Sequence, residues 1–215
     1  VIYSLDSIGY SSQDSLPIYV VKLSANVNTG EPEPKVLILG QCHAEEIYGV
    51  EIAMEIINQF LHPDQNMNNK SYLQKGLLFT ELWIVPTHNP EGLRVVHGYF
   101  EDGIEIKDAT YRKNKWDTNE NGIFDYVAGV GQDIDGVDLN RNYPYMWGMY
   151  GTSDTRGFCP VSGTYRGPSE GSEAETQANM ELMKGMNLYV YFSGHTGSND
   201  IVLPWKITGE NAVPI

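Results

Sequence analysis

The sequence predicts one α/β domain, in which a mixed, mainly parallel β-sheet is flanked by helices. Two short apolar segments support this fold, Val36–Leu39 and Leu188–Phe192. Continuous apolar runs of this length are typical of parallel strands that are covered on both faces. His43 and His195 each come just after the carboxyl end of one of these runs. Because open α/β sheets bind ligands at that edge, we expect the two distant histidines to share one site.

Two further strands are predicted from apolar runs. Ile18–Leu23 is expected to be the first strand, and residues 26–34, which contain a glycine and two prolines, form the turn before the second. Leu82–Pro86 is the third apolar run, and His88 follows it. This position makes His88 an alternative ligand at the same edge of the sheet.

Two helices are expected to cover the sheet. From Glu46 to Leu61, apolar residues recur at helical spacing, which places Glu46 in the first helical turn. A second helix is expected to begin near Ser172, whose pairing with Glu175 is typical of a capping box, and to end around Gly185.

The composition is that of a compact protein with an acidic surface. At 215 residues, of which 41% are hydrophobic and 20% charged, the chain can bury a sizeable core. No run of about 18 apolar residues occurs, so no membrane span is expected. The net charge of −14 argues against nucleic-acid binding. No signal peptide is recognisable at Val1, as expected for a mature or trimmed chain.

The two cysteines, Cys42 and Cys159, give little information. Cys42 is expected to be a small buried side chain at a strand end. A disulfide between the two is an open alternative that spacing cannot decide. Neither cysteine has metal-ligand spacing to another, which excludes a structural thiolate zinc site.

Five motifs together resemble a known family. The motifs are Gln41–Glu46, Asn89–Gly92, Tyr111–Lys115, Asp138–Pro144 and Ser193–Thr196. In order and spacing they are similar to the motifs of the zinc metallocarboxypeptidases of the carboxypeptidase A type, metallopeptidase family M14, from about Ile8 to the end of the chain. Five motifs in register are specific, whereas any one of them would be weak evidence.

The resemblance implies a catalytic zinc ion held by His43, Glu46 and His195. It also implies that Asp138 accepts a hydrogen bond from the second ring nitrogen of His43. Two histidines and one glutamate are a known ligand set for catalytic zinc, with a fourth position left for water. A carboxylate behind a histidine ligand fixes its tautomer and ring orientation. Taken singly, His43 could be a hydrogen-bonded polar residue at a strand end, and Arg141 a surface ion-pair partner. The family motif has no ligand at His88, which is then expected to support a ligand from behind or to be structural.

The same resemblance implies a substrate site for peptide or protein C-termini. Arg112 is expected to polarise the scissile carbonyl, and Asn140 with Arg141 to hold the C-terminal carboxylate. A planar guanidinium binds a carboxylate bidentately, and a second arginine near the metal can stabilise a developing oxyanion. The expected reaction is hydrolysis of a C-terminal peptide bond by water activated on zinc. The alternatives are a related zinc amidase acting on cell-wall peptides and a non-catalytic zinc-binding module.

The chain departs from the family pattern at three places. Glu45 stands where digestive members often have arginine, and Gly197 where animal enzymes have tyrosine. The family's general-base glutamate, mobile tyrosine and specificity pocket lie beyond the third zinc ligand, whereas this sequence ends at Ile215. Glu210, after an expected strand at 201–203, has no motif that would make it a substitute. We therefore expect residues 1–215 to be a C-terminally incomplete catalytic domain, inactive alone, whose partner is the missing part.

The long irregular stretch 98–168 contains a candidate calcium loop. Such a stretch within a compact domain is usually functional. Oxygen-bearing side chains recur there with calcium-loop spacing, although Ala128 stands where an EF-hand has glutamate. The candidate ligands are Asp117, Asn119, Asn121, Asp125, Asp133 and Asp135. A solvated Asn/Asp turn is the alternative interpretation.

The resemblance implies a secreted, extracellular or periplasmic protein.

Overall fold

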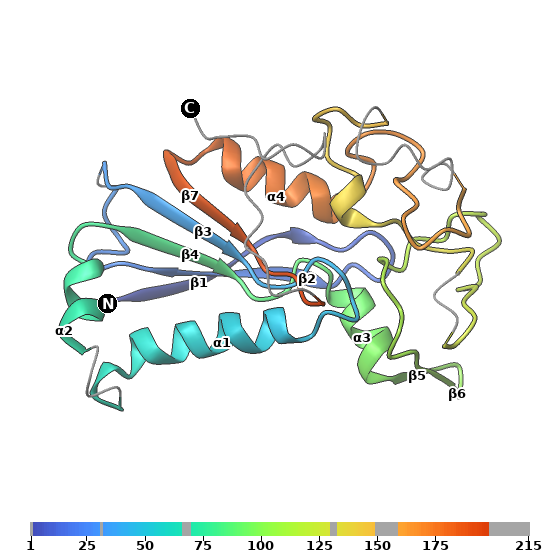
Figure 1. Cartoon of the computed structure of the whole chain (residues 1–215), viewed down its shortest axis with the longest axis horizontal. Coiled ribbons are helices and arrows are strands. Elements are labelled where there is room, and N and C mark those ends of the chain that lie inside the picture. The colour runs from blue at the N-terminus through green and yellow to red at the C-terminus, as the bar shows by residue number, and fades with distance from the viewer. Residues whose placement is uncertain (1, 31, 66–69, 130–132, 149–158, 198–215) are drawn as a thin grey trace.

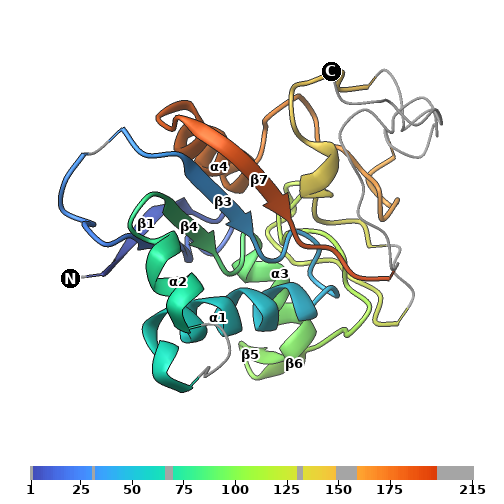
Figure 2. The same cartoon turned by 60° about the vertical axis from the view of Figure 1, so that its left-hand side comes forward.

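A five-stranded sheet forms the centre of the protein in the computed structural model, which describes residues 2–30, 32–65, 70–129, 133–148 and 159–197. The strand order is β1-β2-β4-β3-β7 (Figures 1 and 2). The strands are β1 (Tyr3–Tyr10), β2 (Pro17–Leu23), β3 (Lys35–Leu39), β4 (Glu81–Val85) and β7 (Leu188–Ser193). The β1–β2 and β2–β4 pairings are antiparallel, and β4–β3 and β3–β7 are parallel. The mixed sheet is confirmed, and its parallel half carries the two histidines.

Helices lie on both faces of this sheet, as the apolar runs predict. In Figure 1, α4 (Ala174–Lys184) covers one face, and α1 (Tyr48–Leu61) with α2 (Lys70–Gly76) lies on the other. One core cluster packs Ala178 of α4 against β2, β3 and β4, and a second packs Ala53 and Ile57 of α1 against the opposite face. Burial of these apolar side chains is the main stabilising contribution to the fold. No helix among the described residues is long and apolar enough to span a membrane.

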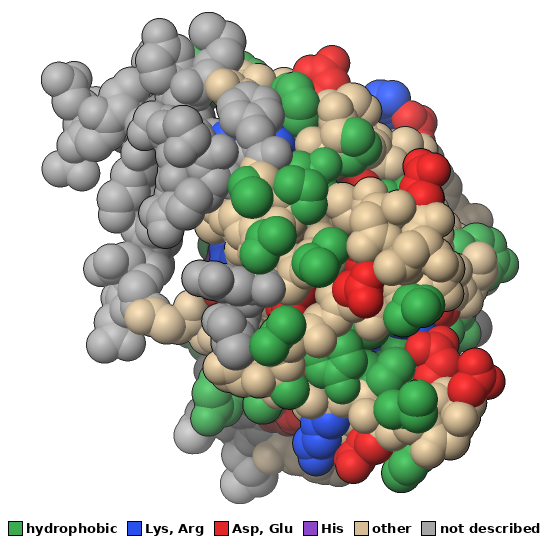
Figure 3. Space-filling view, turned by 90° about the vertical axis from the view of Figure 1, so that its right-hand side faces the viewer, with side chains coloured by type: hydrophobic (Ala, Val, Ile, Leu, Met, Phe, Trp, Pro, Cys, Tyr) green, Lys and Arg blue, Asp and Glu red, His purple; other side chains and the backbone are tan. Residues whose placement is uncertain are grey.

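Most of the remaining elements lie at one end of the molecule, beyond the carboxyl ends of the parallel strands. They are α3 (Pro90–His97), a hairpin of β5 (Tyr99–Glu101) and β6 (Ile104–Ile106), and the 3₁₀ helix η2 (Leu139–Arg141). Another 3₁₀ helix, η1 (Pro63–Gln65), follows α1 and lies beside α2 at the opposite end (Figure 1). Acidic and apolar side chains are both exposed at the end that carries the hairpin (Figure 3). Phe100 and Ile104 of the hairpin are 73% and 69% exposed. The stretch 98–168 is thus mostly irregular, but it contains this hairpin and η2.

Three sequence predictions about the elements are wrong. The first strand is β1 and not Ile18–Leu23, because β1 is an edge strand with a bulge between Ser7 and Gly9 and lacks a continuous apolar run. Glu46 precedes α1, which has Ile47 as its N-cap. No capping box forms at α4, because its N-cap is Glu173 and the Glu175 carboxylate accepts hydrogen bonds from Ser12 instead.

The last described strand, β7, is less covered than predicted. Tyr189 and Phe192 are 79% and 55% exposed, and β7 is paired on one side only among the described strands. The cysteines are both free, Cys42 buried and Cys159 exposed, so the open disulfide alternative is wrong. The strand expected at 201–203 and Glu210 lie outside the described residues.

Candidate metal centre

The backbone brings His43 and His195 together through close contacts between glycines. His43 lies in the loop between β3 and α1, and His195 follows β7. A Cβ added to Gly194 would lie 2.5 Å from the Gly40 carbonyl oxygen, and one added to Gly49 only 1.7 Å from it. The ends of β3, α1 and β7 can therefore meet only because all three positions lack side chains. This packing places both histidines at the predicted edge of the sheet.

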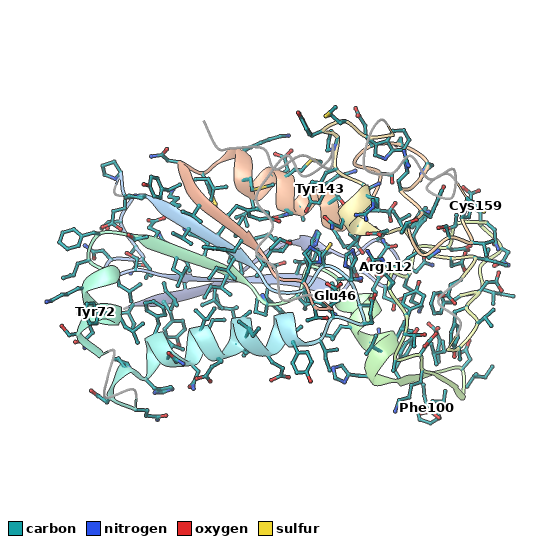
Figure 4. The ribbon with its side chains drawn as sticks, in the orientation of Figure 1. Glu46, Tyr72, Phe100, Arg112, Tyr143 and Cys159 are labelled. Carbon is teal, nitrogen blue, oxygen red and sulfur yellow. The ribbon has the colours of Figure 1, made fainter. Side chains whose placement is uncertain are left out.

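Three side-chain ligand atoms converge there. His43 Nδ1 lies 3.1 Å from Glu46 Oε1 and 3.2 Å from His195 Nδ1, and His195 Nδ1 lies 2.8 Å from Glu46 Oε2. Among the described residues, no other three His, Cys, Asp or Glu side chains bring ligand atoms within 4.8 Å of one another. Figure 4 shows Glu46 beside Arg112 at this point. The sequence predicted this group of three.

The chemistry of this donor set fits zinc. Two imidazole nitrogens and one carboxylate oxygen are borderline donors that zinc accepts, and zinc holds ligands at about 2.0–2.2 Å, so that they lie roughly 3–3.5 Å apart. The carboxyl of Glu46 is ready to bind a cation. Although burial raises its pKa, hydrogen bonds from His195 and His43 lower the pKa of Glu46 to about 2. The carboxylate is therefore ionised at neutral pH.

Asp138 lies on the other side of the His43 ring. Its Oδ1 is 3.1 Å from His43 Nε2, and the side chain is fully buried. Burial raises the pKa of Asp138, but the hydrogen bond from His43 and the charge of Arg112 hold it below its usual value. If His43 binds a metal through Nδ1, its Nε2–H donates to this carboxylate.

Arg112 contacts the same carboxylate. Its Nε and Nη2 donate to Asp138 Oδ2 at 3.1 Å each, and its Nη1 lies 4.0 Å from Glu46 Oε1. Its Nη2 also lies 2.8 Å from His43 Nε2. His43 Nε2 cannot donate a hydrogen bond to Asp138 and accept one from Arg112 at the same time. A metal bound to His43 Nδ1 leaves the ring proton on Nε2, and this disfavours the contact with Arg112.

Asn140 and Arg141, the predicted carboxylate-binding residues, lie on η2, directly after Asp138. The Asp138 carboxylate accepts the Asn140 backbone N–H at 3.0 Å and so caps η2. The side chain of Asn140 is exposed, and Arg141 Nη1 donates to the Asn140 carbonyl at 3.3 Å. One buried aspartate thus links the predicted substrate site to the metal group.

Asn89 is a positioning residue whose role the sequence reasoning missed. Its Nδ2 donates to the carbonyls of Cys42 at 3.1 Å and Lys113 at 3.0 Å, while its Oδ1 caps α3. It therefore ties the segment before His43 to the segment after Arg112. The sequence signalled only its capping role, because an asparagine followed by proline is a strong helix start.

His88 is not part of the metal group. It is fully buried, and its Nε2–H donates to the Glu175 carbonyl oxygen at 3.1 Å. Burial lowers the pKa of His88 to about 4, so the ring is neutral. Its structural role agrees with the family motif.

The structure does not support the predicted calcium site. Carboxylates of the loop accept hydrogen bonds from backbone N–H groups and from side-chain amides. Asp117 accepts from the Gly122 N–H at 2.7 Å, and Asp135 from the N–H groups of Thr118 at 2.9 Å and Asp125 at 2.7 Å. The Asn119 and Asn121 amides both donate to Asp125 Oδ2, at 2.9 and 2.7 Å. In the described parts of the chain, no three His, Cys, Asp or Glu side chains of the loop are placed to hold a metal ion. These contacts are those of a solvated Asn/Asp turn.

The sequence of the chain that carries this metal group and mixed sheet matches one known family. Residues 2–214 match the zinc carboxypeptidases, Peptidase_M14, and the chain belongs to this family. It is 27% identical to a carboxypeptidase B from Astacus astacus over 96% of this chain and 58% of that protein. It is 33% identical to a metallocarboxypeptidase A-like protein from Trichophyton verrucosum over 85% of this chain and 37% of that protein.

Solved structures confirm the fold. Thrombin activatable fibrinolysis inhibitor aligns with a TM-score of 0.72 and 22% identity, over 96% of this chain and 45% of its own. The carboxypeptidase A from Helicoverpa armigera aligns with a TM-score of 0.66 and 21% identity, over 97% and 46%. The chain therefore spans about half the length of the proteins that it matches.

Proposed function

We propose that this chain carries the zinc-binding and carboxylate-binding part of a metallocarboxypeptidase that hydrolyses C-terminal peptide bonds. The convergence of His43, Glu46 and His195 from segments about 150 residues apart carries this proposal. A zinc ion bound there supplies Lewis acidity and lowers the pKa of a water ligand. Family membership supports the reaction class.

The other site residues hold the substrate in this proposal. Arg112 donates to the oxygen of the scissile carbonyl, which its position beside Glu46 supports. Asn140 and Arg141 bind the free carboxylate of the peptide, which the exposed position of Asn140 and the half-buried position of Arg141 on η2 support. Asp138 holds the His43 ring and the η2 backbone in one arrangement, so that metal and substrate groups keep a fixed separation.

In this proposal, none of the acids near the metal group among the described residues is assigned as the general base. Glu46 faces both histidines, Asp138 is engaged by His43 and Arg112, and Glu45 pairs with Arg112. We infer that residues 1–215 are part of a larger catalytic domain, which supplies the base and continues the sheet next to the exposed strand β7. Location outside the cell and calcium binding stay predictions.

Peptides with free and amidated C-termini test this proposal. A carboxypeptidase, assayed as the zinc-loaded longer protein, cleaves the free forms and spares the amidated ones. Equal cleavage of both contradicts the exopeptidase assignment, and turnover of cell-wall peptides instead indicates the amidase. Zinc binding without any turnover indicates the non-catalytic module.

A further inference from the structure

Asn142 is a buried residue directly after the proposed carboxylate-binding pair, and the proposed function gives it no role. It has no exposed surface, and its backbone N–H donates to the Leu139 carbonyl oxygen at 3.2 Å, which makes it the C-cap of η2. Arg141, the residue before it, is half-buried and forms no ion pair with the described residues. The Arg141 guanidinium therefore depends on its backbone for its position.

The Asn142 side chain joins η2 to the loop that leads into α4. Its Nδ2 donates to the carbonyl oxygens of Arg166 at 2.9 Å and Ser169 at 3.2 Å and to Ser172 Oγ at 2.9 Å, and its Oδ1 accepts the Glu173 N–H at 3.1 Å. Both ends of the amide are thus engaged by one loop. A buried polar group whose hydrogen bonds are all made holds its neighbours in a single arrangement.

The packing around this amide is close. A Cβ added to Gly167, whose φ is +88°, would lie 2.7 Å from Asn142 Nδ2 and 2.6 Å from Ser172 Oγ. The loop continues into α4, whose Ala178 packs in the core against the sheet. The Asn142 amide therefore fixes the carboxyl end of η2 relative to the sheet that carries the metal group.

We propose that Asn142 is a positioning residue that holds the Arg141 guanidinium where it meets the C-terminal carboxylate of the substrate. The inference rests on the proposed function, which assigns that carboxylate to Arg141. Asp138 anchors the amino end of η2 through the Asn140 N–H, and Asn142 anchors the carboxyl end. Anchors at both ends are needed because a single turn of 3₁₀ helix has few internal hydrogen bonds, and these have poor geometry.

The two anchors predict different losses. Asp138 contacts the metal ligand His43, so its replacement disturbs the metal group as well as η2. The side-chain contacts of Asn142 are all with residues 166–173. Replacement of Asn142 should therefore weaken the binding of the substrate carboxylate and leave zinc binding intact.

A double-mutant cycle in the zinc-loaded longer protein tests this inference. The quantity measured is kcat/KM on the peptide with a free C-terminus that wild type cleaves fastest. Asn142→Ala should lower kcat/KM about tenfold, because misplacement of a substrate-binding group by about 1 Å can cost up to about 100-fold. In the Arg141→Ala background the same replacement should cost less than about twofold, since the group that it positions is already gone.

A milder variant and a control accompany this cycle. Ser172→Ala removes one acceptor of the Asn142 amide, and it should show a smaller loss that also disappears in the Arg141→Ala background. Asn187→Ala makes the same change of side chain at an exposed position before β7, and it should keep the kcat/KM of wild type.

Zinc affinity, measured by competition with a chelator, and circular dichroism should be unchanged in Asn142→Ala. The same fold-loss of kcat/KM in the presence and absence of Arg141, or a lower zinc affinity in the folded variant, overturns the positioning role and leaves the proposed function intact. Wild-type kcat/KM in Asn142→Ala also overturns it, and if that variant does not fold, the cycle with Ser172→Ala decides by the same criteria. Failure of wild type to cleave any peptide with a free C-terminus contradicts the proposed function itself and removes this inference with it.

Discussion

Replacement of Asp138 by asparagine is expected to lower zinc affinity about 10- to 100-fold. The Oδ1 atom of Asp138 faces His43 Nε2 and the Asn140 N–H, and Oδ2 accepts two N–H groups of Arg112. An asparagine has only one oxygen for these two groups of donors. If the asparagine oxygen faces His43, its NH₂ group faces the N–H donors of Arg112. If the oxygen faces Arg112, the NH₂ group faces the N–H donor of His43. Either way, the ring or the guanidinium loses its fixed position.

The magnitude follows from the position of Asp138 directly behind a metal ligand. Loss of such a partner typically costs 10- to 100-fold in metal affinity, about 1.4–2.7 kcal/mol. Competition with a chromophoric zinc chelator measures it, and circular dichroism shows whether the variant is folded. Asp6→Asn, at an exposed position on β1, is the control for the change of charge. A folded D138N variant with the zinc affinity of wild type would refute the placement of Asp138 behind a zinc-bound histidine.

Three further outcomes are expected. Arg141→Ala in the complete enzyme should reduce kcat/KM about 100-fold on peptides with free C-termini, because loss of a desolvated charge pair costs several kcal/mol. The loss of kcat/KM on amidated analogues should be much smaller, and equal losses on both would show a different role for Arg141. Burial, together with the charge of Glu91, raises the pKa of Glu175 to about 8. Between pH about 4.5 and about 8, the folded protein keeps a proton on Glu175 that the unfolded chain releases. The free energy of unfolding should therefore fall as the pH rises through this range, by up to about 1.4 kcal/mol per pH unit. Thermal melts across this range should show that decline, and a decline of the same size in Glu175→Gln would contradict its origin. The purified 215-residue chain should bind zinc with little peptidase activity, and robust hydrolysis by it would contradict the inference that the base lies elsewhere.

The sequence by itself indicated four of the five strands and the edge of the sheet where the metal group lies. Apolar runs predicted the strands at 18–23, 36–39, 82–86 and 188–192, although Tyr189 and Phe192 of the last are exposed and not covered as predicted. Parallel strands share one carboxyl edge, so His43 and His195 could be paired across about 150 residues. The resemblance to the family motifs, and not spacing alone, added Glu46 to the predicted ligands and left out His88.

The tertiary structure alone decided how those ligands are supported. No local pattern indicated that Asn89 joins the His43 loop to the Arg112 segment, or that Glu45 pairs with Arg112. The edge strand β1 and the hydrogen bonding of the acidic loop could likewise not be predicted from the sequence. A weakly apolar strand and an Asn/Asp-rich turn take their structure from the segments that pack around them. The physical reason is the separation along the chain of the residues that make these contacts. A hydrogen bond depends on tenths of an ångström between side chains that are 20 to 100 residues apart, and packing of the whole chain sets that distance, whereas residue type and periodicity are local properties.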